Sequence, residues 1–249
     1  MTIVMNNRTI SEKIYLITLF IWVVVTSLVT TTYFIRLEGS LSLYRIVLYF
    51  TIAMILIKEL VNLPRSLYHF RFHWEQLLIA VLFIISMFIV AKNRDGLLDI
   101  NVLLLVFSAR DIDFRKLLGT FSFATFLVLV LTIFASNMGV ISNMFMRADG
   151  GYRFSLGFNY VSFASQRLFF ALCSYLMFRG KKISYMELLS LLFATIYMYQ
   201  QTSTTSPFYL SILILTYALF SLKIIKKDFI IGHFWMKTIA KYGFILALI

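Results

Sequence analysis

Long apolar runs separated by short polar stretches dominate the hydropathy pattern of the chain. The first run, residues 14–35, contains 22 residues without a charge and is long enough to cross a bilayer as a helix. Similar runs predict further spans at about 41–57, 76–91, 97–109, 117–137, 159–178, 184–200 and 206–222, with a ninth starting near Thr238. We therefore expect an all-α, polytopic bundle of about eight to nine transmembrane helices, the last of them truncated.

One stretch needs a turn to fit this pattern. Residues 188–222 carry no charge and are too many for a single span. Within them lies the polar sequence QQTSTTSP, residues 200–207, which ends in a proline. Polar residues followed by proline favour a turn and then a helix start, so the stretch is expected to form two helices.

Composition supports a membrane protein with a single domain. Hydrophobic residues make up 61% of the chain and charged residues only 14%, which leaves too few polar groups to cover a surface in water. The first apolar run exceeds a signal-peptide core and is expected to be retained. We expect one integral membrane domain over residues 1–249 with an outer loop at about 138–160. The short ninth span indicates the N-terminal part of a longer protein.

The distribution of cations predicts the orientation. With the N-terminus inside, the expected inner segments hold 16 of the 23 lysines and arginines and the outer segments hold six, as the positive-inside rule requires. If the short run 97–109 does not cross, an N-terminus outside fits almost as well. Both topologies place residues 138–160 outside. The same rule explains the net charge of +12 without nucleic acid as a partner.

The outer loop carries the sequence RADGGYR, which places Arg147 and Arg153 around two glycines. Guanidinium groups can bind phosphate or carboxylate oxygens in pairs, and glycine lets backbone N–H groups approach the same anion. The segment is therefore a candidate anion site, with Asp149 as the carboxylate nearest to the arginines. The alternative is a solvated loop whose arginines contact lipid headgroups.

A further arginine, Arg167, falls about eight residues inside the expected span 159–178. A guanidinium at that depth usually faces a cavity or a partner, and the alternative is that it extends to the headgroups. Helical geometry would place Asn159, Ser162 and Gln166 near one face, joined by Ser155 if the helix starts early. We therefore expect a polar stripe that leads from the loop into a hydrated cavity.

The segment RFSLGFN, residues 153–159, resembles the Arg-x-Ser-Leu-Gly-Phe-x-His-Pro-Asn signature of Wzy-type polysaccharide polymerases from capsule, exopolysaccharide and O-antigen clusters. The order of elements is also similar: several helices, an outer loop, the signature opening a span, and a short basic turn before two further spans. Tyr160, Val161 and Ser162 stand where the signature has histidine, proline and asparagine. Thr204 stands where the family's Ser-Arg-Thr motif has its arginine.

The resemblance implies a glycosyltransferase-like polymerase on the outer face of a bacterial cytoplasmic membrane. Such an enzyme joins undecaprenyl-diphosphate-linked oligosaccharide repeat units and releases the lipid diphosphate. It implies substrate binding by Arg147, Arg153, Ser155, Asn159 and Arg167, with Asp149 as the candidate general base. No metal or other cofactor is expected, because arginines can stabilise the leaving group. Expected partners are the lipid-linked oligosaccharide and membrane lipids, with the flippase and chain-length regulator of the same pathway as candidates.

Three alternatives to the polymerase remain open. The chain could be an inactive, truncated remnant, which the changed signature positions favour. It could be an O-antigen-ligase-like transferase that delivers the glycan to a different acceptor. It could also be a transporter for lipid-linked oligosaccharide, although repeated halves and many intramembrane charges, typical of transporters, are absent from the sequence.

Overall fold

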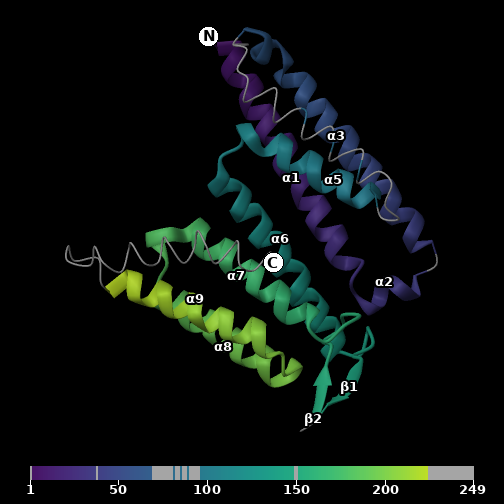
Figure 1. The fold of residues 1–249 in the computed structure, drawn as a ribbon, viewed down its shortest axis with the longest axis vertical. Coiled ribbons are helices and arrows are strands. Elements are labelled where there is room, and N and C mark those ends of the chain that lie inside the picture. Colours follow the sequence, from purple (N-terminus) through teal and green to yellow (C-terminus); the bar gives the residue numbers. More distant parts are fainter. Residues whose placement is uncertain are drawn as a thin grey trace.

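The computed structural model describes residues 2–37, 39–68, 96–148 and 151–223, together with the single positions 81, 85 and 89. Within these residues the chain is almost entirely helical (Figure 1). The longer helices are α1 (Thr2–Leu28), α3 (Ser40–Tyr68), α5 (Gly96–Ser108), α6 (Phe114–Asn137), α7 (Phe163–Arg179), α8 (Tyr185–Thr202) and α9 (Thr205–Lys223). Short elements connect them: α2 (Thr32–Arg36), the 3-10 turns η1 (Ala109–Asp111) and η2 (Gly180–Lys182), and the strands β1 (Phe145–Ala148) and β2 (Gly151–Phe154).

Three of the described helices are long and apolar enough to cross a membrane, over Thr9–Leu28, Ser40–Asn62 and Phe114–Asn137. Shorter apolar helices occupy Gly96–Ser108 and Thr205–Phe220. The predicted helical class and membrane character are thus confirmed at this coarser level. The predicted spans 76–91 and 238–249 lie outside the described residues, apart from positions 81, 85 and 89.

The helix α7 starts later than the sequence pattern predicts. The expected span begins at residue 159, whereas the helix begins at Phe163 and has 17 residues. Residues 155–162 instead form turns that bind the end of α1, as described below. The uncharged stretch 188–222 forms two helices, as predicted: α8 ends at Thr202 and α9 begins at Thr205, so the turn lies within residues 200–207.

The helices pack in two groups that meet at α6. Helices α1, α3 and α5 lie together along one side of α6, and α7, with α8 and α9 beside it, lies along the other (Figure 1). Small residues allow α6 and α7 to approach closely: a Cβ added at Gly119 would lie 2.9 Å from the Phe178 ring, and the Ser122 hydroxyl donates to the carbonyl of the fully buried Ala171 at 3.2 Å. Close contact through small side chains is typical of helix packing in membranes.

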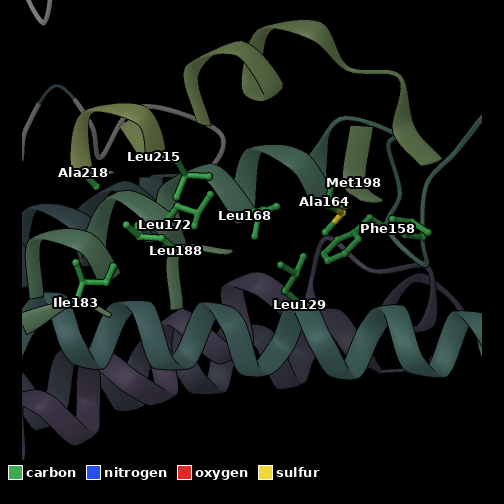
Figure 2. Packing of buried hydrophobic residues seen from close by; sticks show 11 residues of the cluster. Leu129, Phe158, Ala164, Leu168, Leu172, Ile183, Leu188, Met198, Leu215 and Ala218 are labelled. Carbon is green, nitrogen blue, oxygen red and sulfur yellow. The ribbon is translucent and has the colours of Figure 1, made fainter. Parts of the chain in front are cut away.

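Each group has its own apolar core. The core of α1, α3, α5 and α6 includes Tyr15, Leu19, Val23, Ile55 and Leu105. The second core is built by α6–α9 and also contains two residues of the turn that precedes α7, Leu156 and Phe158. Figure 2 shows Phe158 beside Ala164 and Met198, above Leu129 of α6. The turn before α7 is therefore part of the core and not a loose surface loop.

The two ends of the bundle differ in chemistry. At one end, which we call the charged end, ion pairs join neighbouring elements: Lys116 with Glu12 at 2.7 Å, Arg179 with Glu187 at 2.6 Å, and Arg110 with Glu59 at 3.2 Å. Glu59 also pairs with Lys58 of its own helix at 2.8 Å. At the opposite end, which we call the hairpin end, lie α2, the β1–β2 hairpin and the turn before α7 (Figure 1).

Candidate functional site

The loop that the sequence predicts as an anion site forms an antiparallel hairpin. Its register pairs Phe145 with Phe154, Met146 with Arg153, Arg147 with Tyr152 and Ala148 with Gly151. The sequence indicated flexible backbone here and gave no strand. Asp149, the candidate general base, lies outside the described residues.

The two arginines of the hairpin lie on opposite faces of the ribbon. Residues opposite each other across a hairpin share a face, and successive residues alternate between faces. Arg153 therefore shares a face with Met146, whereas Arg147 shares the other with Tyr152. Tyr152 packs edge-on against Phe145 there, with ring centroids 5.6 Å apart. This arrangement separates the two guanidinium groups that the sequence placed around a single anion.

Ser155 fastens the base of the hairpin. It is fully buried, its backbone N–H donates to the Met144 carbonyl at 2.8 Å, and its hydroxyl oxygen accepts from the Met144 N–H at 3.0 Å. The next residue, Leu156, has a positive φ of 55°, and its N–H donates to Asn143 Oδ1 at 2.9 Å. The Asn143 side chain thus stabilises a conformation that is unfavourable for leucine.

Glycine is required at position 157. Its φ is +87°, and an added Cβ would lie 2.6 Å from Ile141 Cδ1, 3.0 Å from Thr132 Cγ2 and 3.1 Å from Ser136 Cβ. The close approach lets the Gly157 carbonyl accept from the Thr32 N–H at 2.9 Å. Gly157 therefore joins the signature segment to both α6 and the chain just after α1.

The signature segment pairs with the threonines that follow α1. Thr31 and Phe158 form an antiparallel bridge, and the Asn159 N–H donates to the Thr30 carbonyl at 2.9 Å. The Thr32 hydroxyl donates to the Ser142 carbonyl at 2.9 Å. The sequence reasoning missed residues 30–32 as partners, although three consecutive threonines in an apolar run were a visible signal.

Arg167 also binds the end of α1. Its Nη1 donates to Ser27 Oγ at 2.5 Å, and its Nη2 donates to Thr30 Oγ1 at 2.9 Å and to the Thr26 carbonyl at 3.5 Å. A cation near a helix C-terminus is favoured by the exposed carbonyls and the helix dipole. In this structure the guanidinium links α7 to the end of α1.

Asn159 borders a pocket at the hairpin end. The pocket has a volume of about 480 Å³ and is lined by Asn143, Met144, Phe145, Met146, Ser155, Asn159, Tyr160 and Val161. The Asn159 amide Nδ2 donates to the Val29 carbonyl at 3.4 Å, whereas its Oδ1 is buried without a hydrogen bond to any described residue. Asn159 therefore lines the pocket while its buried amide oxygen has no hydrogen-bond partner among the described residues.

The predicted polar stripe is only partly helical. Asn159 and Ser155 precede α7, so they do not continue its helical face. Ser165, inside α7, belongs instead to a compact group of hydroxyls with Thr202 and Thr204, joined by hydrogen bonds of 2.7, 2.7 and 2.8 Å. At position 204, where the polymerase motif has arginine, the threonine ties the α8–α9 turn to α7.

The cations and polar side chains of the hairpin end are suited to a polar or anionic ligand. Over the described part of the chain, no group of three or more histidines, cysteines, aspartates or glutamates is placed to hold a metal ion. The side chains of Arg147 and Arg153 make no hydrogen bond or ion pair with another described residue. The hairpin end thus presents two cations that the fold itself does not use.

The fold and these contacts define a helical membrane protein with a structured hairpin at one end of the bundle. Comparison with known proteins adds no relative: the sequence matches no family model, no curated protein and no solved structure.

Proposed function

We propose that the chain is a Wzy-type glycan polymerase, or the N-terminal part of one, with eight to nine membrane spans. The hairpin end would face the outside of a bacterial cytoplasmic membrane, and the substrates would be undecaprenyl-diphosphate-linked oligosaccharides. The proposal rests on the signature resemblance at residues 153–159 and on the cation excess of the expected inner segments.

The observation that carries the proposal is the position of Arg153. It lacks a described partner and lies opposite Met146, one of the residues that line the 480 Å³ pocket. Ser155 and Asn159 line the same pocket. Arg153 is not itself a lining residue, but it is the strand partner of one. A guanidinium on this hairpin is suited to a diphosphate, because charge develops on the phosphate oxygens as the glycosyl bond breaks.

The geometry divides the predicted site residues into two roles. Arg153, with Arg147 on the other face of the ribbon, is proposed to bind the diphosphate. Ser155, Asn159 and Arg167 are proposed to position the loop, since their described hydrogen bonds go to the hairpin base and to the end of α1. Asp149 remains the candidate base that takes the proton of the acceptor hydroxyl as the sugar moves onto it.

Gene deletion with complementation tests the function. The deletion strain should accumulate single lipid-linked repeat units and lose long polymer, and wild type should restore it. Arg153→Ala and Arg153→Lys should both fail, because lysine keeps the charge but cannot bind two oxygens in parallel. Arg45→Ala is the matched control: Arg45 is an exposed cation of α3, near the same end of the bundle, and its removal should leave polymer length unchanged.

The alternatives give different readouts in the same strains. Unchanged polymer on deletion identifies a remnant, an outcome that the threonine at position 204 favours. Long polymer that stays on its lipid carrier identifies a ligase-like transferase. Repeat units that accumulate on the inner face identify a transporter. Each of these results would replace the polymerase proposal.

A further inference from the structure

A second pocket lies at the charged end of the bundle, between α6 and the end of α7. It has a volume of about 380 Å³ and is lined by Phe114, Arg115, Leu118, Met177, Arg179, Gly180 and Lys182. It is separate from the hairpin-end pocket, and no residue lines both. None of the predicted site residues lines it.

Three cations line this pocket, and two of them, Arg115 and Lys182, have exposed hydrogen-bond donors without a described acceptor. Arg115 donates from Nε to the Phe178 carbonyl at 2.7 Å and from Nη2 to the Arg179 carbonyl at 3.3 Å, which leaves Nη1 without a described acceptor. The Nε of Arg179 is buried without a partner among the described residues. The Lys182 ammonium makes no hydrogen bond or ion pair with them, and the residue is exposed.

The nearby carboxylates neutralise this charge only in part. Glu187 pairs with Arg179 Nη2 at 2.6 Å and also accepts the Ser184 N–H at 2.8 Å. Asp113 caps α6 by accepting the Arg115 N–H at 2.9 Å. Arg115 and Lys182 are therefore left without a carboxylate partner among the described residues.

The same pocket has an apolar wall that faces outward. Phe114 is 61% exposed and Met177 60% exposed, and Leu118 lies one turn deeper on α6. Residues 114 and 118 belong to a helix that is long and apolar enough to cross a membrane, so this wall would meet lipid acyl chains. Cations at the end of a helix pair, joined to an apolar wall, match a molecule with an anionic head and apolar tails.

We propose that this pocket binds the phosphodiester headgroup of an anionic phospholipid in the leaflet at the charged end. The phosphate would accept from Arg115 Nη1 and from the Lys182 ammonium, beside the charge of Arg179, and the acyl chains would lie along Phe114, Leu118 and Met177. Basic pockets between membrane helices on the side richer in cations are suited to such headgroups. The proposal is independent of the glycan polymerase function.

Lipid titration of the purified chain tests the site. In detergent, short-chain phosphatidylglycerol, phosphatidylcholine and soluble glycerol phosphate are each titrated, and bound ligand is counted by native mass spectrometry. Phosphatidylglycerol should bind most tightly. Lys182→Gln should weaken it about fivefold, as expected for one cation near a headgroup. The matched control is Lys13→Gln, which removes an exposed lysine of α1 at the same end but outside the pocket.

The apolar wall is tested separately with Met177→Gln, a change at an exposed position that leaves every described hydrogen bond in place. It should weaken phosphatidylglycerol binding while leaving the preference over phosphatidylcholine intact. Equal binding of the two lipids would overturn the proposal, as would equal effects of Lys182→Gln and Lys13→Gln. Glycerol phosphate binding as tightly as the lipid would assign the pocket to a soluble anion instead.

Discussion

At the charged end four of the described cations pair with carboxylates but Arg115 and Lys182 do not, whereas neither arginine of the hairpin has a carboxylate partner among the described residues. Glu12, Glu59 and Glu187 each pair with a cation from the same or an adjacent helix. Arg147 and Arg153 are presented on a ribbon that is held by other groups. A cation that pairs with a carboxylate stabilises the fold, whereas a cation without such a partner is available to a ligand.

The hairpin end is ordered by backbone contacts and hydroxyls more than by charge. The signature segment binds residues 30–32 through main-chain hydrogen bonds, and Gly157 allows the close approach. This difference predicts that single changes near the signature affect stability more than removal of a surface ion pair. The following changes test it in order of expected size.

The largest effect is expected for Gly157→Ala. The positive φ and the contacts at 2.6–3.1 Å of an added Cβ should together destabilise the folded state by about 3 kcal/mol. Gly139→Ala is the matched control, because Gly139 has a φ of +74° but open space around its Cβ. That control should lose only about 1 kcal/mol. Equal losses in detergent unfolding experiments would show that the packing against α6 contributes nothing.

Arg167→Met should be the next most damaging change. It removes the hydrogen bonds to Ser27 and Thr30 that link α7 to α1, with a loss of about 2 kcal/mol in the free energy of unfolding. Arg167→Lys keeps the charge and should recover part of this loss. If the methionine variant unfolds at the wild-type denaturant concentration, the arginine is not a structural link and is free for a ligand.

Thr204→Val should have a smaller effect. It keeps the shape of the side chain but removes the hydrogen bonds of the Thr204 hydroxyl to Ser165 and Thr202. The free energy of unfolding should fall by about 1 kcal/mol. Thr205→Val, at the adjacent exposed position, is the control and should be nearly neutral. Thermal unfolding in one detergent compares the pair, and a larger effect at position 205 would contradict the structure.

The smallest effect is expected at the charged end. Glu12→Gln removes the pair with Lys116, whose side chain is 55% exposed, and should reduce stability by about 0.5 kcal/mol. Because salt screens such pairs, the difference from wild type should shrink as ionic strength rises. A loss that is large and independent of salt would show that ion pairs, and not packing, hold this end together.

The sequence predicted α3 and α6 well because their signal is local, whereas the expected first span, residues 14–35, is interrupted after Leu28, where α1 ends. The expected spans 41–57 and 117–137 fall within α3 and α6, and the expected turn in 200–207 overlaps the observed one. An uncharged run of membrane length specifies a helix without reference to the rest of the chain. Even so, the expected span ends at residue 57, whereas α3 continues past the charges at Lys58 and Glu59 to Tyr68.

The site was harder to predict because its contacts are distant in the chain. The bridge between Thr31 and Phe158 and the bonds from Arg167 to Ser27 join residues more than 120 positions apart. No local pattern identifies such partners. Of the residues chosen from the signature, Ser155 and Asn159 line one pocket and Arg153 does not. The sequence could not separate positions that hold the loop from positions left free for substrate.

The most direct test of the account is the binding of undecaprenyl diphosphate to the purified chain in nanodiscs of zwitterionic lipid. We predict that wild type binds it, that Arg153→Ala weakens binding about tenfold through loss of a charge-assisted contact, and that Arg45→Ala binds like wild type. Wild-type affinity in Arg153→Ala, or an equal loss in Arg45→Ala, would contradict the assignment of the hairpin arginine as the ligand-binding cation.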